Sequence, residues 1–277
     1  MGIWCTNYAF GGFVASALAG FAADYFLDWR FAFYVPAAVL FGIWLLFIFL
    51  QRNRPEDVGL PPIEEYHNEK VTLIDPDDTP EEEAEGSWKV IGEVLSNRMV
   101  LLLGSVSFLL KPTRYLILFW SPVYVSERLG TEAMESGILG SMFELAGPLS
   151  VLFGGLVSDF VFGSKRMPIS ILALIGVGTL LLFFDDLPAT RWSLGLGFFG
   201  IGLLLFIPDS LLSGAAAIDF GTKKGASTAA GFINGCGSLG AIIGGTLPGW
   251  VQGFMAEGES MWSYIFVGLG ISLFGAA

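Results

Sequence analysis

The chain has 277 residues, of which 53% are hydrophobic, and its mean hydropathy is +0.66. These values exclude an ordinary soluble domain and indicate an integral membrane protein. The formal net charge is −12, and no nucleic-acid partner is expected. The charge suggests a polyanionic exterior, but 13 of the 26 acids lie between Gln51 and Ser96. The negative charge is therefore concentrated in one hydrophilic segment.

Eight apolar stretches recur along the chain, most of them near the roughly 20 residues that a helix needs to cross about 30 Å of hydrocarbon. They cover residues 3–23, 31–50, 99–125, 136–158, 167–184, 192–218, 226–253 and 262–277. The pattern predicts an all-α membrane protein with about eight transmembrane helices. The last stretch holds only 16 residues, and we expect the final helix to be truncated.

A hydrophilic segment separates the first two stretches from the other six. Its centre, DPDDTPEEEAEGS at 75–87, has no apolar periodicity and contains two prolines. This composition is typical of a solvated, largely disordered linker. We therefore expect three parts: a helix pair at 1–50, an acidic linker at 51–97 and a six-helix bundle at 98–277.

Basic residues near the spans set the orientation, because lysine and arginine cross a membrane reluctantly. Connections on the side of the linker carry nine of them, whereas the opposite side carries Arg30, Arg128 and Arg191. The linker is therefore expected to face the cytoplasm. Two helices, a long cytoplasmic loop and six helices match a six-loop-six transporter without its first four helices, so that 1–50 is the end of an N-terminal half. In such transporters the substrate lies between two halves.

Two cations interrupt the apolar stretch at 99–125. Lys111 and Arg114 are three residues apart and therefore share one face of a helix. A charge against lipid at the bilayer centre costs about 2.5 to 3.5 kcal/mol on insertion scales. Both side chains are thus expected to face a watery cavity or another helix. Glu144, in the following span, is the expected partner of an arginine on a neighbouring helix.

The connection GGLVSDFVFGSKR carries a loop signature whose residues are Gly155, Asp159, Gly163, Lys165 and Arg166. The first glycine is expected to allow close helix approach, and the aspartate to find a partner at the helix end. The basic pair is expected to hold the loop at the anionic inner surface of the membrane. The segment resembles the cytoplasmic loop of the major facilitator superfamily; the alternative is an ordinary charged loop.

Four further stretches resemble, in order and spacing, the organophosphate:phosphate antiporter family of that superfamily. They are DVGLPPIEEY (57–66), RYLILFWSPVYV (114–125), FELAG (143–147) and KKGASTAAGF (223–232). The likeness covers essentially the whole chain. It implies a multi-pass protein of the inner membrane that exchanges glycerol 3-phosphate or a sugar phosphate for inorganic phosphate by alternating access. No enzymatic activity and no cofactor or metal site are expected, since no such residue spacing is present.

The resemblance also implies roles for individual residues. Arg114 matches a phosphate-binding arginine, whose planar fork can donate two parallel hydrogen bonds to a phosphate, and Glu144 would balance its charge. Lys111 stands where one member of the family has a tyrosine; it adds a second cation to the site or pairs with Glu144. Tyr8 stands where a family motif has a histidine, and therefore lacks a charge switch near neutral pH.

Asp209, in FIPDSLL, has no clear equivalent in the family pattern. It is a second counter-ion, a charge-coupling proton site, or a side chain solvated at a bend near Pro208, and the last is the interpretation that we adopt. Ala230 and Ile233 occupy places where hexose-phosphate members carry an acid and a lysine, which favours a smaller ester. The small residues Gly231, Gly235, Gly240 and Gly244 predict close packing of their helix.

Two other functions stay open. A transporter-like sensor would bind a sugar phosphate and signal through a partner protein, with the acidic linker as the docking segment. An inactive truncated product is the other alternative, because half of a site that lies between two halves does not translocate readily. The family's other phosphate-binding arginine belongs to the first helix, which we expect this chain to lack.

Overall fold

The computed structural model describes residues 2–52, 55–61, 91–163, 166–211, 226–255 and 260–277, and all regular structure in these ranges is helical. The helices are α1 (Gly2–Phe26), α2 (Phe31–Leu50), the 3₁₀-helix η1 (Pro55–Val58), α5 (Arg98–Leu129), α6 (Ala133–Phe162), α7 (Arg166–Leu182), α8 (Arg191–Ser210), α10 (Ala226–Phe254) and α11 (Met261–Ala276). These bounds follow the eight expected spans closely. The expected extension of the sixth span to residue 218 passes the end of α8 into residues outside the described ranges.

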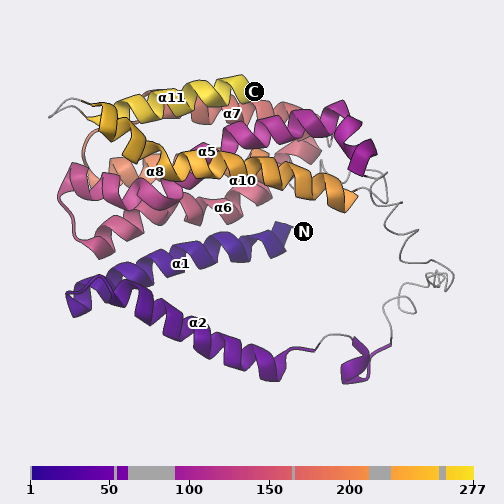
Figure 1. The fold of residues 1–277 in the computed structure, drawn as a ribbon, viewed down its shortest axis with the longest axis horizontal. Helices are drawn as coiled ribbons and strands as arrows, with labels where there is room; N and C mark the ends of the chain where they lie inside the picture. The colour runs from indigo at the N-terminus through magenta and orange to yellow at the C-terminus, as the bar shows by residue number, and fades with distance from the viewer. Residues whose placement is uncertain (1, 53–54, 62–90, 164–165, 212–225, 256–259) are drawn as a thin grey trace.

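Five of the described helices are long and apolar enough to cross a membrane: α2, α5, α6, α8 and α10. The apolar parts described in α1, α7 and α11 are shorter. Successive helices run in opposite directions, and the connections after α1, α5 and α7 lie together at the left in Figure 1. We call this the outer end, because the linker expected to face the cytoplasm joins the opposite end.

Local capping explains where the long helices begin and end. The Asn97 side chain accepts a hydrogen bond of 2.9 Å from the Met99 amide and so caps the N-terminus of α5. Gly130 ends α5, and Gly163 ends α6, with φ angles of 65° and 58°. Only glycine adopts this left-handed conformation without strain. Glycine at 163, a residue of the loop signature, is therefore required by the helix end.

The expected linker is not unstructured throughout. Residues 91–96 are helical, and Val94 is buried with Val100, Leu103 and Ile233. An apolar side chain in this last turn before α5 gains by packing on α5 and α10, because burial removes it from water. The acidic centre of the linker, 75–87, lies outside the described residues.

An aromatic cluster holds the outer ends of α5, α7, α8 and α11 together. Tyr124 lies at its centre, with ring centroids 5.2 Å from Phe266 and 5.3 Å from Trp262. Its hydroxyl donates a hydrogen bond of 3.1 Å to Asp185, and Arg128 donates to the Asp185 carbonyl at 2.7 Å. Aromatic edge-to-face packing and these hydrogen bonds fix this end of the bundle.

Helix α1 packs along α6, as Figure 1 shows. A Cβ atom on Gly20 would lie 2.7 Å from the Met134 Cα, and one on Gly137 would lie 3.2 Å from the Ser16 carbonyl oxygen. At the outer end, the Asp24 carboxylate accepts a hydrogen bond of 2.6 Å from the Met134 amide, in the first turn of α6. The negative charge thereby faces the positive end of the α6 dipole.

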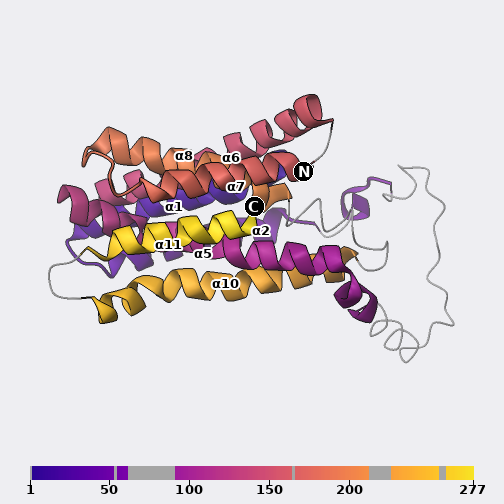
Figure 2. The same cartoon turned by 90° about the horizontal axis from the view of Figure 1, so that it is seen from above.

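Helix α10 lies along α5 (Figure 2). Pro112 has no amide hydrogen, so the Phe108 carbonyl loses its helical donor, and Gly240 packs directly against that carbonyl. Gly244 packs in the same way against the Pro112 carbonyl. The predicted close packing is confirmed for these two glycines. It is wrong for Gly231 and Gly235, where no atom of the described residues lies within 4 Å of the place that a Cβ would take.

Replacing Gly244 by alanine tests this packing. The added methyl group would overlap the Pro112 carbonyl, so α10 has to move away from α5. We expect the free energy of unfolding to fall by about 1 to 3 kcal/mol, measured by thermal unfolding of the purified protein in detergent. Gly235→Ala is the matched control, and its stability should be unchanged or raised by up to about 1 kcal/mol. Equal stability of the two variants would contradict the packing described here.

Candidate functional site

The two cations of α5 meet a carboxylate from α8. The Lys111 Nζ atom lies 2.6 Å from Asp209 Oδ1, and the Arg114 guanidinium pairs with Asp209 Oδ2. The three side chains are only 12%, 9% and 8% exposed. Each oxygen of one buried carboxylate is therefore paired with a different cation. We call Lys111, Arg114 and Asp209 the charge cluster.

Phe206 completes the surroundings of the arginine. The guanidinium carbon of Arg114 lies 4.7 Å from the centroid of the Phe206 ring, which itself lies 5.0 Å from the Phe143 ring. A guanidinium over an aromatic face gains a cation–π attraction. Because Phe206 and Asp209 are three residues apart, they share one face of α8. That face supplies both an anion and a ring to the cations.

The depth of the residues in the bundle explains why they meet. Lys111 lies about 18 residues before the end of α5, and Asp209 lies about 18 residues after the start of α8. Both helix termini belong to the outer end, so both side chains stand roughly 27 Å from it at 1.5 Å per residue. The similar depth of Lys111 and Asp209 can be inferred from the sequence once the limits of the two spans are known. It is the signal that the sequence interpretation missed.

A glycine on α10 makes room for the lysine. A Cβ on Gly237 would lie 2.9 Å from Cγ and 3.2 Å from Cε of Lys111. The apolar stem of the lysine thus runs over this glycine while its ammonium group reaches Asp209. Gly237 was not singled out from the sequence, since its role depends on the side chain opposite.

Asp209 is not solvated, and that interpretation is wrong. Its residue exposure is 7%, and it is paired with both cations. The helix does not end at Pro208, since α8 continues through the proline to Ser210. Two buried cations on α5 make an anion at this position favourable.

Glu144 is buried, but it does not hold the partner predicted for it. Its exposure is 4%, and its carboxylate lies directly against Gly12 of α1. Among the described residues it forms no ion pair, and its Oε2 atom has no hydrogen-bond partner. The direct ion pairs of Lys111 and Arg114 are thus made with Asp209, and the predicted direct pairing with Glu144 is not seen among the described residues, where Glu144 acts on Arg114 only as a nearby charge. The Tyr8 side chain lies outside the described residues.

The loop signature at the end of α6 is partly corrected. In the described part of the chain, a Cβ on Gly155 would meet no atom within 4 Å, whereas one on Gly154 would lie 3.0 Å from Ile207 of α8. The close helix approach is thus made by Gly154 and not by Gly155. Asp159 lies exposed in the last turn of α6, and Arg166 begins α7. Lys165 lies outside the described residues.

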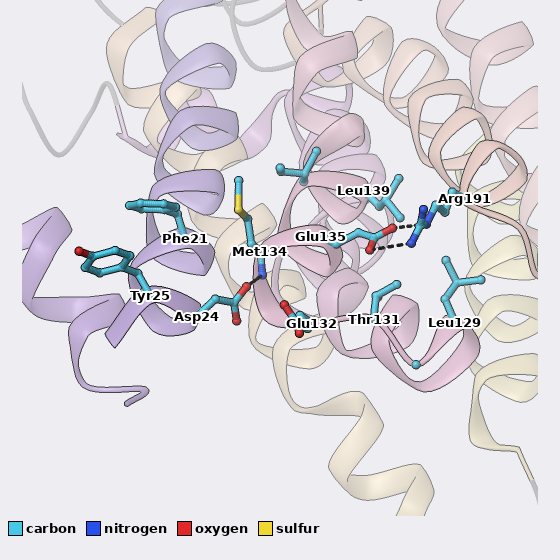
Figure 3. A pocket seen from close by; sticks show the side chains of 12 residues that line it. Phe21, Asp24, Tyr25, Leu129, Thr131, Glu132, Met134, Glu135, Leu139 and Arg191 are labelled. Atoms are coloured by element: carbon cyan, nitrogen blue, oxygen red, sulfur yellow. Dashed lines mark hydrogen bonds and ion pairs between the residues drawn. The ribbon is translucent and has the colours of Figure 1, made fainter. Parts of the chain in front are cut away.

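A cavity of about 740 Å³ opens at the outer end (Figure 3), and none of the residues that line it belongs to the charge cluster. Its polar side chains include Asp24 of α1, Glu135 of α6 and Arg191 of α8. Arg191 pairs with Glu135, and its side chain is 70% exposed. This rim pair is solvated, unlike the charge cluster. The cavity is a hollow between the outer ends of α1 and α6.

Comparison with known proteins identifies the family. A family model described as Major Facilitator Superfamily matches residues 1–245. The chain belongs to the major facilitator superfamily. Its assignment as an integral, multi-pass, all-α membrane protein follows from that match and from the apolar helices. Its relatives include transport proteins and no enzyme is expected in this family, in agreement with the sequence.

Three curated relatives narrow the family further. The chain is 30% identical over 252 residues to a probable hexose phosphate transport protein of Chlamydia pneumoniae, covering 88% of this chain and 55% of that protein. It is 30% identical over 258 residues to the glycerol-3-phosphate transporter of Bacillus subtilis, and the match covers 93% of this chain and 57% of that protein. It is also 30% identical over 259 residues to the membrane sensor protein UhpC of Salmonella typhimurium, covering 90% and 54%.

These relatives confirm the resemblance to the organophosphate:phosphate antiporter family. The chain spans little more than half of the length of each of them, from 54% to 57%. Their identities to this chain are equal at 30%, so they do not separate glycerol 3-phosphate from hexose phosphate, or transport from sensing.

A double-mutant cycle tests the charge cluster. Asp209→Asn leaves two buried cations side by side, so it should cost about 3 to 5 kcal/mol of the free energy of unfolding. Lys111→Met should then cost roughly 1 to 3 kcal/mol less in the Asp209→Asn background than in the wild type. Denaturant unfolding of the four proteins in phosphate-free buffer measures this coupling.

The exposed pair of Arg191 and Glu135 provides the control cycle. Its coupling should stay below about 1 kcal/mol, because water screens an exposed ion pair. If the costs of Lys111→Met and Asp209→Asn simply add within about 0.5 kcal/mol, the two side chains are not paired as described.

Proposed function

We propose that the protein is a secondary active transporter of the inner membrane that exchanges a phosphate ester for inorganic phosphate by alternating access. The observation that carries this proposal is the pair of buried cations on one face of α5. Two adjacent cations in an apolar bundle match a ligand that carries up to two negative charges. The transport proteins among the relatives support the same ligand class.

In this proposal Arg114 clamps the phosphate group. Its fork can donate two parallel hydrogen bonds to phosphate oxygens, and the Phe206 ring behind it fixes the plane of the guanidinium. Lys111 supplies a second, more compact charge next to it. Glu144 and Tyr8 are proposed to face the remainder of the substrate from the interface of α1 and α6, where Glu144 already touches α1.

The ester itself is proposed to be glycerol 3-phosphate or a sugar phosphate. Ala230 and Ile233 on α10 leave no charge for the hydroxyl groups of a large sugar, and Ile233 is fully buried. This favours the smaller ester. Both kinds of ester occur in the names of the relatives, so a transport assay has to include both.

A sensor is the second candidate, favoured by the likeness to the membrane sensor protein UhpC. Such a protein would bind the phosphate ester with the same cations and pass the signal to a partner protein. It would bind substrate without appreciable flux.

Exchange by the full-length protein in phosphate-loaded vesicles tests the transport proposal. We expect uptake of radiolabelled glycerol 3-phosphate or glucose 6-phosphate that depends on internal phosphate. Arg114→Ala should lower the exchange rate at least about 100-fold, because a charged, bidentate contact worth roughly 3 kcal/mol is lost. Arg191→Ala removes an arginine from the exposed rim pair and should leave the rate within about twofold of the wild type.

Two outcomes would redirect the assignment. Binding of the ester without any exchange supports the sensor. Normal exchange by the Arg114→Ala protein refutes the proposed phosphate site, whichever ester is carried.

A further inference from the structure

Asp209 occupies the cations that the proposed function assigns to phosphate. Its two oxygens are divided between Lys111 and Arg114, so that one carboxylate bridges both. A phosphate group bound to the same two side chains would place two of its oxygens where the carboxylate oxygens now lie. We propose that Asp209 is a built-in competitor of the substrate, which holds the two cations in the empty site and is displaced when a phosphate binds. This inference rests on the proposed function.

The competition follows from the chemistry of the groups. A carboxylate and a phosphate oxygen are both charged acceptors for ammonium and guanidinium donors. The site cannot be left empty of anions, since two unpaired cations in an apolar bundle are strongly unfavourable. An internal carboxylate therefore keeps the empty site stable. The same carboxylate lowers the affinity for any external anion by the free energy needed to displace it.

The position of Asp209 favours displacement. It is the second-last residue of α8 and follows Pro208, which cannot donate to the Leu204 carbonyl. The helix is therefore less constrained there than in its middle. Glu144 does not compete in this way, because its carboxylate lies against Gly12 and is not paired with either cation.

The displacement cost acts as a threshold on ligand charge. Every anion must replace the same carboxylate, so a singly charged anion exchanges one negative charge for another and gains little. A phosphate monoester carries about −1.5 to −2 charges at pH 7, and it offers the two cations more charge than Asp209 does. Asp209 thereby lowers the affinity for every anion by the same factor, so that a monocarboxylate binds too weakly to occupy the site whereas a phosphate monoester still binds.

Binding of radiolabelled inorganic phosphate to the purified full-length protein tests the inference. Asp209→Asn should tighten the dissociation constant by at least about tenfold, because the competing charge is gone while the amide keeps the shape. Glu144→Gln removes a negative charge from the same region without freeing a cation, and its effect should be clearly smaller. Glu135→Gln removes the acid of an arginine pair at the outer rim, and it should leave phosphate affinity unchanged.

A second pair of variants keeps the test decisive if Asp209→Asn alone does not fold. Lys111→Met should lose phosphate binding, since Asp209 then neutralises the remaining arginine. The double variant Lys111→Met/Asp209→Asn should bind phosphate again, at least about tenfold more tightly than Lys111→Met. Unchanged or weaker binding by Asp209→Asn, or no recovery in the double variant, would overturn the competition.

The outcomes separate this inference from the proposed function. If the wild type binds phosphate through Arg114 and Asp209→Asn binds no more tightly, the competition is refuted and the proposed site stands. If neither the wild type nor Asp209→Asn binds phosphate or a phosphate ester, the proposed function fails and the competition fails with it. Binding by Asp209→Asn alone supports both.

Discussion

Two positive charges inside an apolar helix bundle require an anion, and this requirement governs the arrangement around α5. Lys111 and Arg114 cannot face lipid at low cost, and Asp209 of α8 meets both of them. These ion pairs fix the register of α8 against α5, because a shift by one turn would separate the Asp209 carboxylate from Lys111 and Arg114. Phe206, one turn earlier on α8, adds an aromatic face to the same contact.

Small residues provide the space that the charges need. Gly237 leaves room for the lysine stem, while Gly240 and Gly244 let α10 approach the backbone of α5 at Pro112. The proline matters here because it frees the Phe108 carbonyl of its helical donor, so a glycine surface can lie against it. The two cations of α5 thus lie beside close backbone packing between α5 and α10, which holds α5 in place.

The sequence predicted the helices well because membrane spans are set by length and apolarity, which are local properties. It also identified Arg114 and Lys111 as buried cations, because a charge in an apolar run stands out without any knowledge of its neighbours. The partners were harder to predict. Glu144 was chosen for Arg114 since it lies in the adjacent span, yet Asp209 is 95 residues away and pairs with it.

The errors have a common physical cause. Whether a glycine allows close approach, or an acid meets a cation, depends on which faces of two helices turn toward each other. Gly154 and Gly155 are neighbours in sequence and differ by about 100° around the helix, so only Gly154 faces α8. Likewise, a proline before Asp209 suggested a bend and solvation, whereas tertiary packing keeps α8 helical to Ser210.

The contact between α1 and α6 limits the kind of motion available to the two helices. Glycines at which the other helix lies too close for a Cβ occur on both helices: Gly12 and Gly20 on α1, and Gly137 on α6. Sliding one helix along the other would bring a side chain into a space that holds only hydrogen, which is sterically costly. Tilting the helices apart meets no such obstacle. At the outer end it breaks, among the described residues, only the hydrogen bond between Asp24 and the Met134 amide. The contact between α1 and α6 therefore opposes sliding more strongly than tilting.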